Sequence, residues 1–503
     1  MLNQPITDNY NLILDADSYK TSHFKQYPEG TEFVSSYIES RGGDYDETVF
    51  FGLQHFLKKY LSKPITMADI DEAEDVLTAH GMPFNREDWE YILDKYDGYL
   101  PIEIEAVPEG SVLPTKNALV QVKNTDPKLP WLTSYVETTL LRAVWYPVTV
   151  ATHSRECKKV IQEFVERTSD TADVDGIADF MLQDFGARAA TCYEQAAIGG
   201  AAHLVNFKGS DTLQGILMLR RYYNESMAGF SIPASEHSTM TSWGRDQEKD
   251  AYENMVDQFG GEGKMLAVVS DSYNLWNALE NIWGDELKEK VKENGGRVVI
   301  RPDSGDPIET CIKTVETLME RFGYETNNKG YKVLPDYIRV IQGDGVSRKN
   351  IQTILEKLEE KGIAAENLAF GMGGELLQKV NRDTLKFAMK ASAACVDGKW
   401  RDVYKDPITD PGKRSKRGRL MTLFNGESFE TINVKDYGQK TGQNMLETVF
   451  YNGKIQKEYS LADIRKRAAV PKQFNDAAAK EAANDNPTKT PVAPKAKAAG
   501  LKK

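Results

Sequence analysis

A regular alternation of short apolar runs and helical patterns, between about residues 179 and 384, constrains the fold of this chain most. Each apolar run ends in a polar or glycine-rich turn, and repeated strand–helix units of this kind favour a parallel sheet. Seven such steps over about two hundred residues fit a (β/α) barrel with ligands at the carboxyl ends of its strands, and a doubly wound open sheet is the alternative. We expect the strands near residues 180–182, 203–205, 229–232, 265–269, 297–301, 337–341 and 368–370.

The clearest of these units is RVVIRPDSGDP at 297–307. Its β-branched run predicts a strand buried on both faces. Asp306 is the predicted N-cap of the helix that follows, with a proline at the first helical position and Glu309 completing a capping box. Arg301 and Asp303 would then stand where a strand ends and a helix begins, which is where such folds bind ligands. Taken alone, the pair could equally be a salt bridge that only fixes a loop.

The ends of the other expected strands also have residues that could bind a ligand. Glycines before a helix let backbone N–H groups approach a phosphate, and carboxylates suit ribose hydroxyls or Mg²⁺. Phe185 is either a core aromatic residue or a platform for a flat ring, and a lone histidine such as His237 is more often packed than catalytic. No P-loop motif is present. The polar set comprises Asp184, Asp211, Glu236, Asp271, Asp303, Asp344, Arg188, Arg301 and Arg382, with glycine-rich turns at 343–345 and 371–374.

Composition excludes several classes of protein. The 63 Lys and Arg residues against 75 Asp and Glu residues give a net charge of −12, which argues against a nucleic-acid-binding surface. Four scattered cysteines without a C-x-x-C pair predict reduced thiols in the cytosol rather than zinc or disulfides. No secretory signal and no apolar run long enough for a membrane helix is visible, so we expect a cytoplasmic protein.

The remaining segments predict a second, mixed layer. We expect an α+β domain over 1–178, the catalytic barrel over 179–384, a C-terminal segment over 385–474 that completes the α+β domain, and a disordered tail over 475–503. Within the first domain, helical patterns cover 49–61, 131–143 and 151–167, and strand patterns cover 33–39 and 102–107.

Several motifs, taken in order, resemble one family. The chain is similar to the nicotinamide phosphoribosyltransferases, type II phosphoribosyltransferases, from about Asn11 to about Arg467. The resemblance implies an irregular (β/α) barrel packed on an α+β domain, in a head-to-tail homodimer with both active sites at the interface. The motifs are DSYK at 17–20, YDG at 96–98, DFG at 184–186, VNFKG at 205–209, EHST at 236–239, IRPDSG at 300–305, VIQGDGV at 340–346 and KDP at 405–407.

The resemblance also implies the reaction. Nicotinamide and phosphoribosyl pyrophosphate would give nicotinamide mononucleotide and pyrophosphate, with Mg²⁺ as cofactor and ATP as co-substrate. ATP would phosphorylate His237, with Glu236 beside it. Phe185 and the partner's Tyr19 would sandwich the pyridine ring, and Asp211 would accept the carboxamide N–H₂.

The other site residues are implied in the same way, and no metal ligand is assigned. Asp303, expected to be catalytic, would face the ribose hydroxyls, and Arg301 would face the ring and the phosphates. Ribose, 5′-phosphate and pyrophosphate would engage Gly343, Asp344, Gly373, Gly374, Ser270, Arg188, Arg382, Arg41, Lys390, Lys405 and Lys413, some of them from the partner.

Three features depart from the family pattern, namely Gln183 in place of His, Asn274 in place of Asp, and a short loop after Arg41.

Two other functions remain open. A nicotinate phosphoribosyltransferase would share the fold, but the Asp211 carboxylate would repel an acidic ring substituent. A non-catalytic binding or signalling protein on this fold is disfavoured by the intact set of polar residues at the strand ends.

Overall fold

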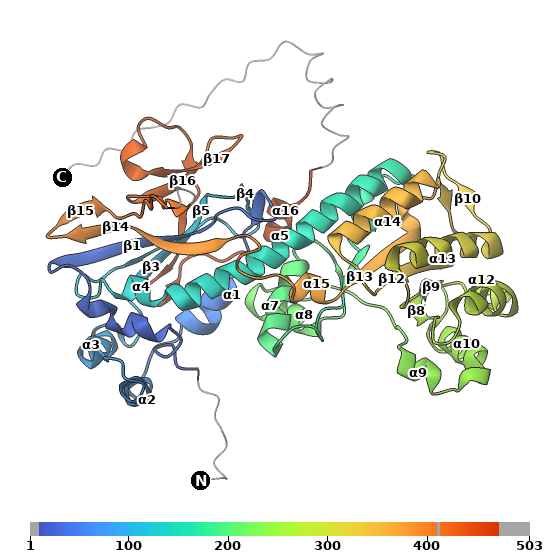
Figure 1. Cartoon of the computed structure of the whole chain (residues 1–503), viewed down its shortest axis with the longest axis horizontal. Coiled ribbons are helices and arrows are strands. Elements are labelled where there is room, and N and C mark those ends of the chain that lie inside the picture. Colours follow the sequence, from blue (N-terminus) through green and yellow to red (C-terminus); the bar gives the residue numbers. More distant parts are fainter. Residues whose placement is uncertain (1–9, 410–412, 472–503) are drawn as a thin grey trace, which may run out of the picture. The chain divides into compact units, whose positions relative to one another are not determined.

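A computed structural model describes residues 10–409 and 413–471 of the chain, so the predicted disordered tail at 475–503 lies outside the described residues. The residues up to Ala469 form one compact unit. This unit contains two large sheets, one antiparallel and one parallel (Figure 1). None of the described helices is long and apolar enough to cross a membrane. The domain boundaries expected from the sequence stay a prediction.

The antiparallel sheet has seven strands in the order β15-β14-β1-β5-β3-β19-β20. Strands from both ends of the chain alternate in it, since β1 pairs with β5 on one side and with β14 on the other. Its inward positions are apolar, for example Ile102 and Ile104, which are fully buried. The strands are β1 (Thr31–Ser40), β3 (Ile102–Ala106), β5 (Ala118–Asn124), β14 (Phe387–Val396), β15 (Lys399–Asp402), β19 (Glu447–Tyr451) and β20 (Lys454–Ile455).

The parallel sheet has six strands in the order β7-β6-β13-β12-β9-β8. The segment 230–235 connects its two edges through isolated parallel bridges, Phe230 with Gly209 and Ala234 with Ala267. The expected irregular barrel is therefore confirmed. The strands are β6 (Leu182–Asp184), β7 (Gly209–Ser210), β8 (Met265–Val269), β9 (Arg297–Arg301), β12 (Ile338–Gln342) and β13 (Leu368–Met372).

Two of the seven expected strands were wrong. Residues Tyr193–His203 form helix α7, and the next strand is the two-residue β7. A short apolar run cannot distinguish a strand from the end of a buried helix, and the His203 ring is buried between Ser154 and the Leu182 carbonyl. Within residues 229–232, Phe230 makes one isolated bridge, with Gly209, rather than a strand.

Helices cover the parallel strands, with α13 and α14 beside β9 and β12 in Figure 1. Helix α13 begins as expected, because the Asp306 side chain accepts from the backbone N–H groups of Ile308 and Glu309. The Glu309 carboxylate pairs with Lys357 on α14 instead of completing a capping box. The helices around this sheet are α6 (Val174–Ala178), α7, α8 (Leu213–Tyr222), α9 (His237–Thr241), η3 (Arg245–Gln247), α10 (Glu248–Phe259), α11 (Leu275–Asn277), η4 (Ala278–Glu286), α12 (Lys288–Glu293), α13 (Pro307–Phe322), α14 (Arg348–Glu360), η5 (Ala365–Asn367) and α15 (Gly374–Leu377).

One long helix, α5 (Glu137–Thr168), contacts β14 of the antiparallel sheet and the helices α7 and α14 beside the parallel sheet (Figure 1). Its 32 residues give it a length of about 48 Å. The sequence predicted two separate helices over 131–143 and 151–167, and this was wrong, because α5 continues through Pro147. Proline costs a helix roughly 3 kcal/mol, but most of α5 is buried and its packing outweighs that loss. Gly52 makes room for the proline ring, since a Cβ there would lie 2.6 Å from Pro147.

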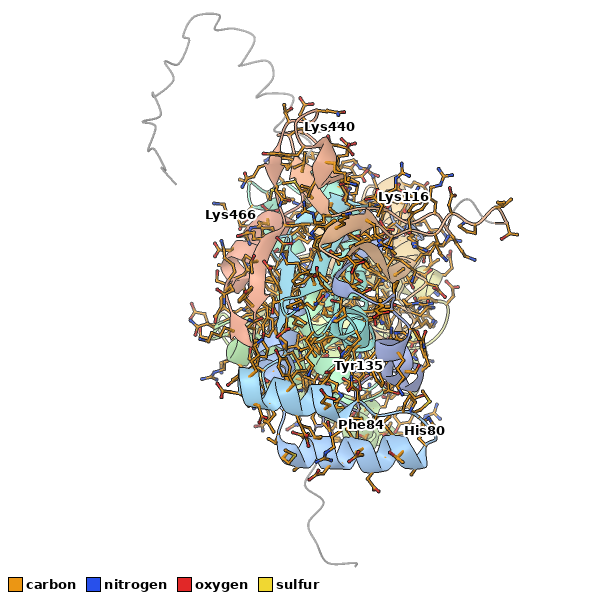
Figure 2. All side chains as sticks on the ribbon, turned by 90° about the vertical axis from the view of Figure 1, so that its left-hand side faces the viewer. His80, Phe84, Lys116, Tyr135, Lys440 and Lys466 are labelled. Carbon is orange, nitrogen blue, oxygen red and sulfur yellow. The ribbon has the colours of Figure 1, made fainter. Side chains whose placement is uncertain are left out.

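A helical layer lies beside the N-terminal strands of the antiparallel sheet. Figure 2 shows Tyr135 between the antiparallel sheet and the helices α2 and α3. The Tyr135 ring packs against Trp89, and its hydroxyl donates to the Ile13 carbonyl. The helix expected over 49–61 begins only at Leu53, because Gly52 adopts a left-handed φ of 103°. This layer contains η1 (Ser18–Lys25), α1 (Leu53–Phe56), η2 (Leu57–Leu61), α2 (Met67–Ala79), α3 (Arg86–Tyr96) and α4 (Leu132–Tyr135).

Smaller elements complete the fold. Two pairs of short strands and one three-stranded sheet lie outside the two large sheets. They are β2 (Glu47–Val49) with β4 (Val112–Pro114), β10 (Glu325–Thr326) with β11 (Lys332–Val333), and β16 (Leu420–Phe424) with β17 (Phe429–Asn433) and β18 (Gln443–Asn444); η7 (Val434–Asp436) and α16 (Leu461–Ala468) follow late in the chain.

Candidate active site

The carboxyl ends of the parallel strands bring the predicted ring, ribose and histidine residues to one rim. Parallel strands end at the same edge of a sheet, so the residues that follow them face a common space. The residues that follow are Phe185 after β6, Asp211 after β7, Asp271 after β8, Asp303 after β9, Asp344 after β12 and Gly373 after β13.

Phe185 lies across two glycine-bearing strand ends. A Cβ on Gly371 would meet its ring at 2.1 Å, and one on Gly343 would lie 3.4 Å from the same ring. Beneath the ring is a small apolar cluster from the barrel interior, formed by Ala267, Val299 and Ile341. The half-buried ring therefore has one supported face, as a stacking platform requires.

The Arg301–Asp303 corner stands next to this ring. From the Cβ position of Gly343, Arg301 Cδ and Asp303 Oδ1 are each 3.6 Å away. Arg301 Nε lies 3.5 Å from Asp303 Oδ1, and this buried Nε has no hydrogen-bond partner. A buried, unpaired donor is costly. The pair thus faces the rim with unused donor capacity, and it is not the closed salt bridge that the alternative interpretation required.

His237 and Asp271 form a pair that the sequence analysis did not assign. His237 Nε2 lies 3.0 Å from Asp271 Oδ1, and Nδ1 lies 3.8 Å from Asp303 Oδ2. The Asp271 side chain is 1% exposed, and its second oxygen accepts from the Asp303 backbone N–H and the Ser304 hydroxyl. Asp271 was noted among the strand-end acids. Its place after an apolar run was the available signal, but its role as a hub depends on three segments meeting in space.

Two further carboxylates lie near Phe185, one directly before it on β6 and one after the neighbouring strand β7. Asp184 is buried, which raises its pKa to about 6, although the Gly186 backbone N–H donates to it. Asp211 is exposed, and its Oδ1 accepts from the Ser231 hydroxyl at 2.5 Å. The backbone N–H of Asp211 donates to the Asp184 carbonyl. The two acids therefore lie on neighbouring strand ends.

Two predicted site residues direct their side chains elsewhere. Ser270 is fully buried, and its hydroxyl lies between the Val268 carbonyl and the Trp283 indole N–H. Glu236 accepts from the hydroxyl of Ser238 in its own turn, and no hydrogen bond with the His237 ring is recorded for it. In both cases the sequence identified the segment but not the direction of the side chain.

The phosphate-binding candidates at the rim are open to solvent. Arg188 and Asp344 are exposed, and the exposed Arg382 makes only a long ion pair of 3.7 Å with Asp383. Gly373 and Gly374 begin α15, and no atom comes closer than 3.6 Å to a Cβ placed on either of them. A ligand could approach the backbone at this turn.

A second set of predicted residues lies on the antiparallel sheet and the helix η1. Tyr19 is 56% exposed, and its neighbour Lys20 pairs with Glu137. Two buried guanidinium nitrogens of Arg41, Nε and Nη2, make no hydrogen bond, and Nε lies 3.5 Å from Glu39 Oε1. Lys390 is half-buried, and burial lowers its pKa, with the nearby Arg41, Lys405 and Lys20 acting in the same direction. Lys413 follows the undescribed residues 410–412.

A cavity of about 610 Å³ lies away from the rim residues named above. Tyr10, Phe56, Tyr60 and Trp145 line it, and Thr191 and Cys192 on the loop after Phe185 form part of its wall. None of the predicted catalytic or substrate-binding residues lines it. Its size alone is therefore a poorer guide to the chemistry than the convergence of charged residues at the strand ends.

The departures from the family pattern have local structural roles. Gln183 donates to the Phe180 carbonyl, and Asn274 caps α11 by accepting from the Asn277 backbone N–H. Arg41 is followed by two glycines with positive φ.

No cluster of three or more His, Cys, Asp or Glu side chains that could hold a metal ion occurs within residues 10–409 and 413–471.

Comparisons with known proteins agree with this geometry. A model described as "Nicotinate phosphoribosyltransferase (NAPRTase) family" matches residues 180–454, and one described as "Nicotinamide phosphoribosyltransferase, N-terminal domain" matches residues 11–104. A nicotinamide phosphoribosyltransferase of Xanthomonas campestris pv. campestris is 52% identical over 462 residues, covering 91% of this chain and 98% of that protein. One from Acinetobacter baylyi is 32% identical, with 90% and 96% covered.

Solved structures show the same fold at low sequence identity. A nicotinate-nucleotide pyrophosphorylase from Pyrococcus furiosus has a TM-score of 0.60 at 14% identity, covering 93% of this chain and 97% of that one. Human nicotinic acid phosphoribosyltransferase has a TM-score of 0.53 at 16% identity, with 90% and 92% covered.

Proposed function

This chain belongs to the nicotinate phosphoribosyltransferase family, with a nicotinamide phosphoribosyltransferase N-terminal domain, and we propose from this premise that it converts nicotinamide and phosphoribosyl pyrophosphate into nicotinamide mononucleotide and pyrophosphate. The observation that carries the proposal is the rim itself, where a supported aromatic ring, a carboxylate and an arginine with an unused donor stand side by side. The reaction serves the salvage of NAD.

In this mechanism the chain's residues orient the two substrates. The pyridine ring stacks on Phe185, and its carboxamide donates to Asp211. The ring nitrogen attacks C1 of the ribose as the C1–O bond to pyrophosphate breaks. Positive charge develops on the sugar and negative charge on the leaving group. Asp303 beside Gly343 stabilises the first, and Arg301 with the exposed Arg188 and Arg382 stabilises the second, by preorganised electrostatics.

His237 is the proposed acceptor of the ATP γ-phosphate. Because a carboxylate only accepts hydrogen bonds, Asp271 fixes the proton on Nε2 and leaves Nδ1 with a free lone pair. Nδ1 attacks phosphorus, the P–O bond to ADP breaks, and a P–N bond forms. The phosphoryl group then places negative charge beside Asp303 and alters the rim's affinity for its substrates.

Mg²⁺ fits this donor set through the substrate. In proteins the ion binds one or two carboxylates, several waters and substrate phosphates. Asp303 and Asp344 are the carboxylates available to hold it. When bound, the ion neutralises the charge of the pyrophosphate.

The proposal includes a homodimer with shared sites. Tyr19 is largely exposed, and Arg41 Nη2 makes no hydrogen bond while Nε lies 3.5 Å from Glu39, so both residues retain capacity that a second copy of the chain could engage. In this arrangement the partner's Tyr19 stacks on the open face of the ring held by Phe185. A cytoplasmic location also stays a proposal.

The test is an assay for mononucleotide formation from nicotinamide or nicotinic acid, with and without ATP. We expect nicotinamide to be used, with a lower KM when ATP is present. Selective use of nicotinic acid would favour the second candidate function, that of a nicotinate phosphoribosyltransferase. The description of the family model that matches residues 180–454 supports this candidate. No product from either base would contradict both.

A further inference from the structure

We propose that Ser231 is a positioning residue that sets the preference for a carboxamide over a carboxylate on the pyridine ring. The inference rests on the proposed function and concerns a residue to which neither the resemblance nor the comparisons give a role. Its basis is the hydrogen bond that the Ser231 hydroxyl donates to the Asp211 carboxylate at Oδ1.

An exposed aspartate does not discriminate between ligands by charge alone. Asp211 is exposed, and only its backbone is fixed, through the bond from its N–H to the Asp184 carbonyl. Without a further contact its carboxylate would rotate among several staggered rotamers in water. The Ser231 hydroxyl holds one oxygen, so the other is presented to a ligand in one orientation. A single oriented acceptor matches a carboxamide N–H and opposes a carboxylate.

Ser231 is itself placed by the backbone. On one side, the Phe230 backbone exchanges hydrogen bonds of 2.7 and 3.0 Å with Lys208 and Ser210. On the other, Ala267 donates to Pro233, and its carbonyl accepts from Ser235. The segment 230–235 is therefore fixed to both edges of the parallel sheet, and the position of the Ser231 hydroxyl follows from this attachment.

The same segment lies against the ring platform. Ile232, the next residue, packs on the apolar cluster of Ala267, Val299 and Ile341 that also supports Phe185. A pyridine ring stacked on Phe185 would thus have its substituent close to the Ser231–Asp211 pair. The pair and the platform share one support, so the distance between ring and acceptor is set by the barrel rather than by a loop.

The experiment compares steady-state kinetics of the full-length wild type, Ser231→Ala and Ser231→Thr with nicotinamide and with nicotinic acid. For Ser231→Ala we expect the KM for nicotinamide to rise about tenfold, the loss of one hydrogen bond to a charged group, with kcat and the KM for phosphoribosyl pyrophosphate within about twofold of the wild-type values. The ratio of kcat/KM between the two bases should fall accordingly. Ser231 is exposed, so threonine fits and should restore most of the ratio through its hydroxyl.

Outcomes separate this inference from the proposed function. A wild type that makes no mononucleotide from nicotinamide would refute the function, whatever the variants do. A wild type that prefers nicotinamide together with an unchanged ratio in Ser231→Ala would overturn the role of Ser231 alone. Equal losses for both bases and for phosphoribosyl pyrophosphate would also overturn it, because they would indicate damage to the fold.

Discussion

At the scale of single residues, the rim depends on how side chains are held as much as on which ones are present. Asp271 contacts the His237 ring, the Asp303 backbone and the Ser304 hydroxyl at once. Its carboxylate is almost completely buried. A carboxylate in this position fixes the tautomer of the histidine and the path of the loop that carries Asp303.

We therefore expect Asp271→Asn to slow phosphorylation of His237 by up to about 10⁴-fold, the loss seen when a buried carboxylate that orients a catalytic histidine is made an amide. The amide can donate to Nε2 and so favours the wrong tautomer. Transfer of ³²P from γ-labelled ATP measures the effect. Ser304→Ala, which removes one contact of Asp271 but keeps its charge, should lose far less. Equal labelling of Asp271→Asn and the wild type would refute the role.

The ring platform gives a second prediction. Gly371→Ala would place a Cβ 2.1 Å from the Phe185 ring and force it to move. We expect the KM for nicotinamide to rise by about tenfold or more, the loss of stacking worth roughly 1–3 kcal/mol. Gly438→Ala is the matched control, since nothing lies within 4 Å of a Cβ there. The idea fails if both variants bind nicotinamide equally well in a calorimetric titration.

At the scale of elements, features encoded in a short stretch of sequence could be predicted. Features that depend on contacts with distant segments could not. The corner at 297–307 formed as expected because strand, N-cap and proline signals all lie within eleven residues of sequence. The continuity of α5 through Pro147 was not predictable, since it depends on Gly52 and on burial by distant segments. Likewise, Phe185, His237 and Asp303 could be named from motifs, whereas Asp271 and Ser231 act through contacts between separate strand ends.

Glu109 links several elements and carries a pH prediction. Its buried carboxylate accepts from the backbone N–H groups of Gly52 and Gln54 at the start of α1 and from the Tyr223 hydroxyl after α8. Burial raises its pKa from 4.5 to about 6. The folded state therefore holds the proton more tightly than the unfolded chain. The stability that this proton contributes is complete below pH 4.5 and is lost as the pH rises through 6.

The expected size of this change is about 2 kcal/mol in the free energy of unfolding. Urea unfolding midpoints at several pH values between 4 and 7 would measure it. Glu109→Gln should be less stable overall, because an amide cannot accept all three hydrogen bonds, and its midpoint should vary less with pH than that of the wild type. The exposed Glu262→Gln should keep the wild-type slope. An identical slope in Glu109→Gln would contradict the assignment.

At the scale of the whole molecule, the predicted site residues fall into two sets, one at the barrel rim and one around Tyr19 and the antiparallel sheet. Shared sites in a symmetric dimer make a definite prediction. Tyr19→Ala and Phe185→Ala should each be nearly inactive. Co-expression should restore about a quarter of the wild-type activity, because half of the dimers are mixed and each of these has one intact site.

The measurement is mononucleotide formation by the purified mixture. Mixed dimers isolated through two different affinity tags should reach about half of the wild-type activity, because each has one intact site of two. Co-expression of Phe185→Ala with Asp211→Asn is the control, since both changes lie at one rim and no intact site can form. A Tyr19→Ala and Phe185→Ala mixture as inactive as its parents would refute shared sites.

The order of strands in the antiparallel sheet also has a consequence for biosynthesis. β1 ends at Ser40, whereas its neighbour β14 begins at Phe387. At about 5–20 residues per second, a ribosome needs roughly 20–70 s to make the intervening chain. Throughout that time one edge of β1 has no partner strand of its own. An edge of this kind invites pairing with other chains, so the nascent protein should depend on chaperones more than a chain of this length whose sheets close in order of synthesis.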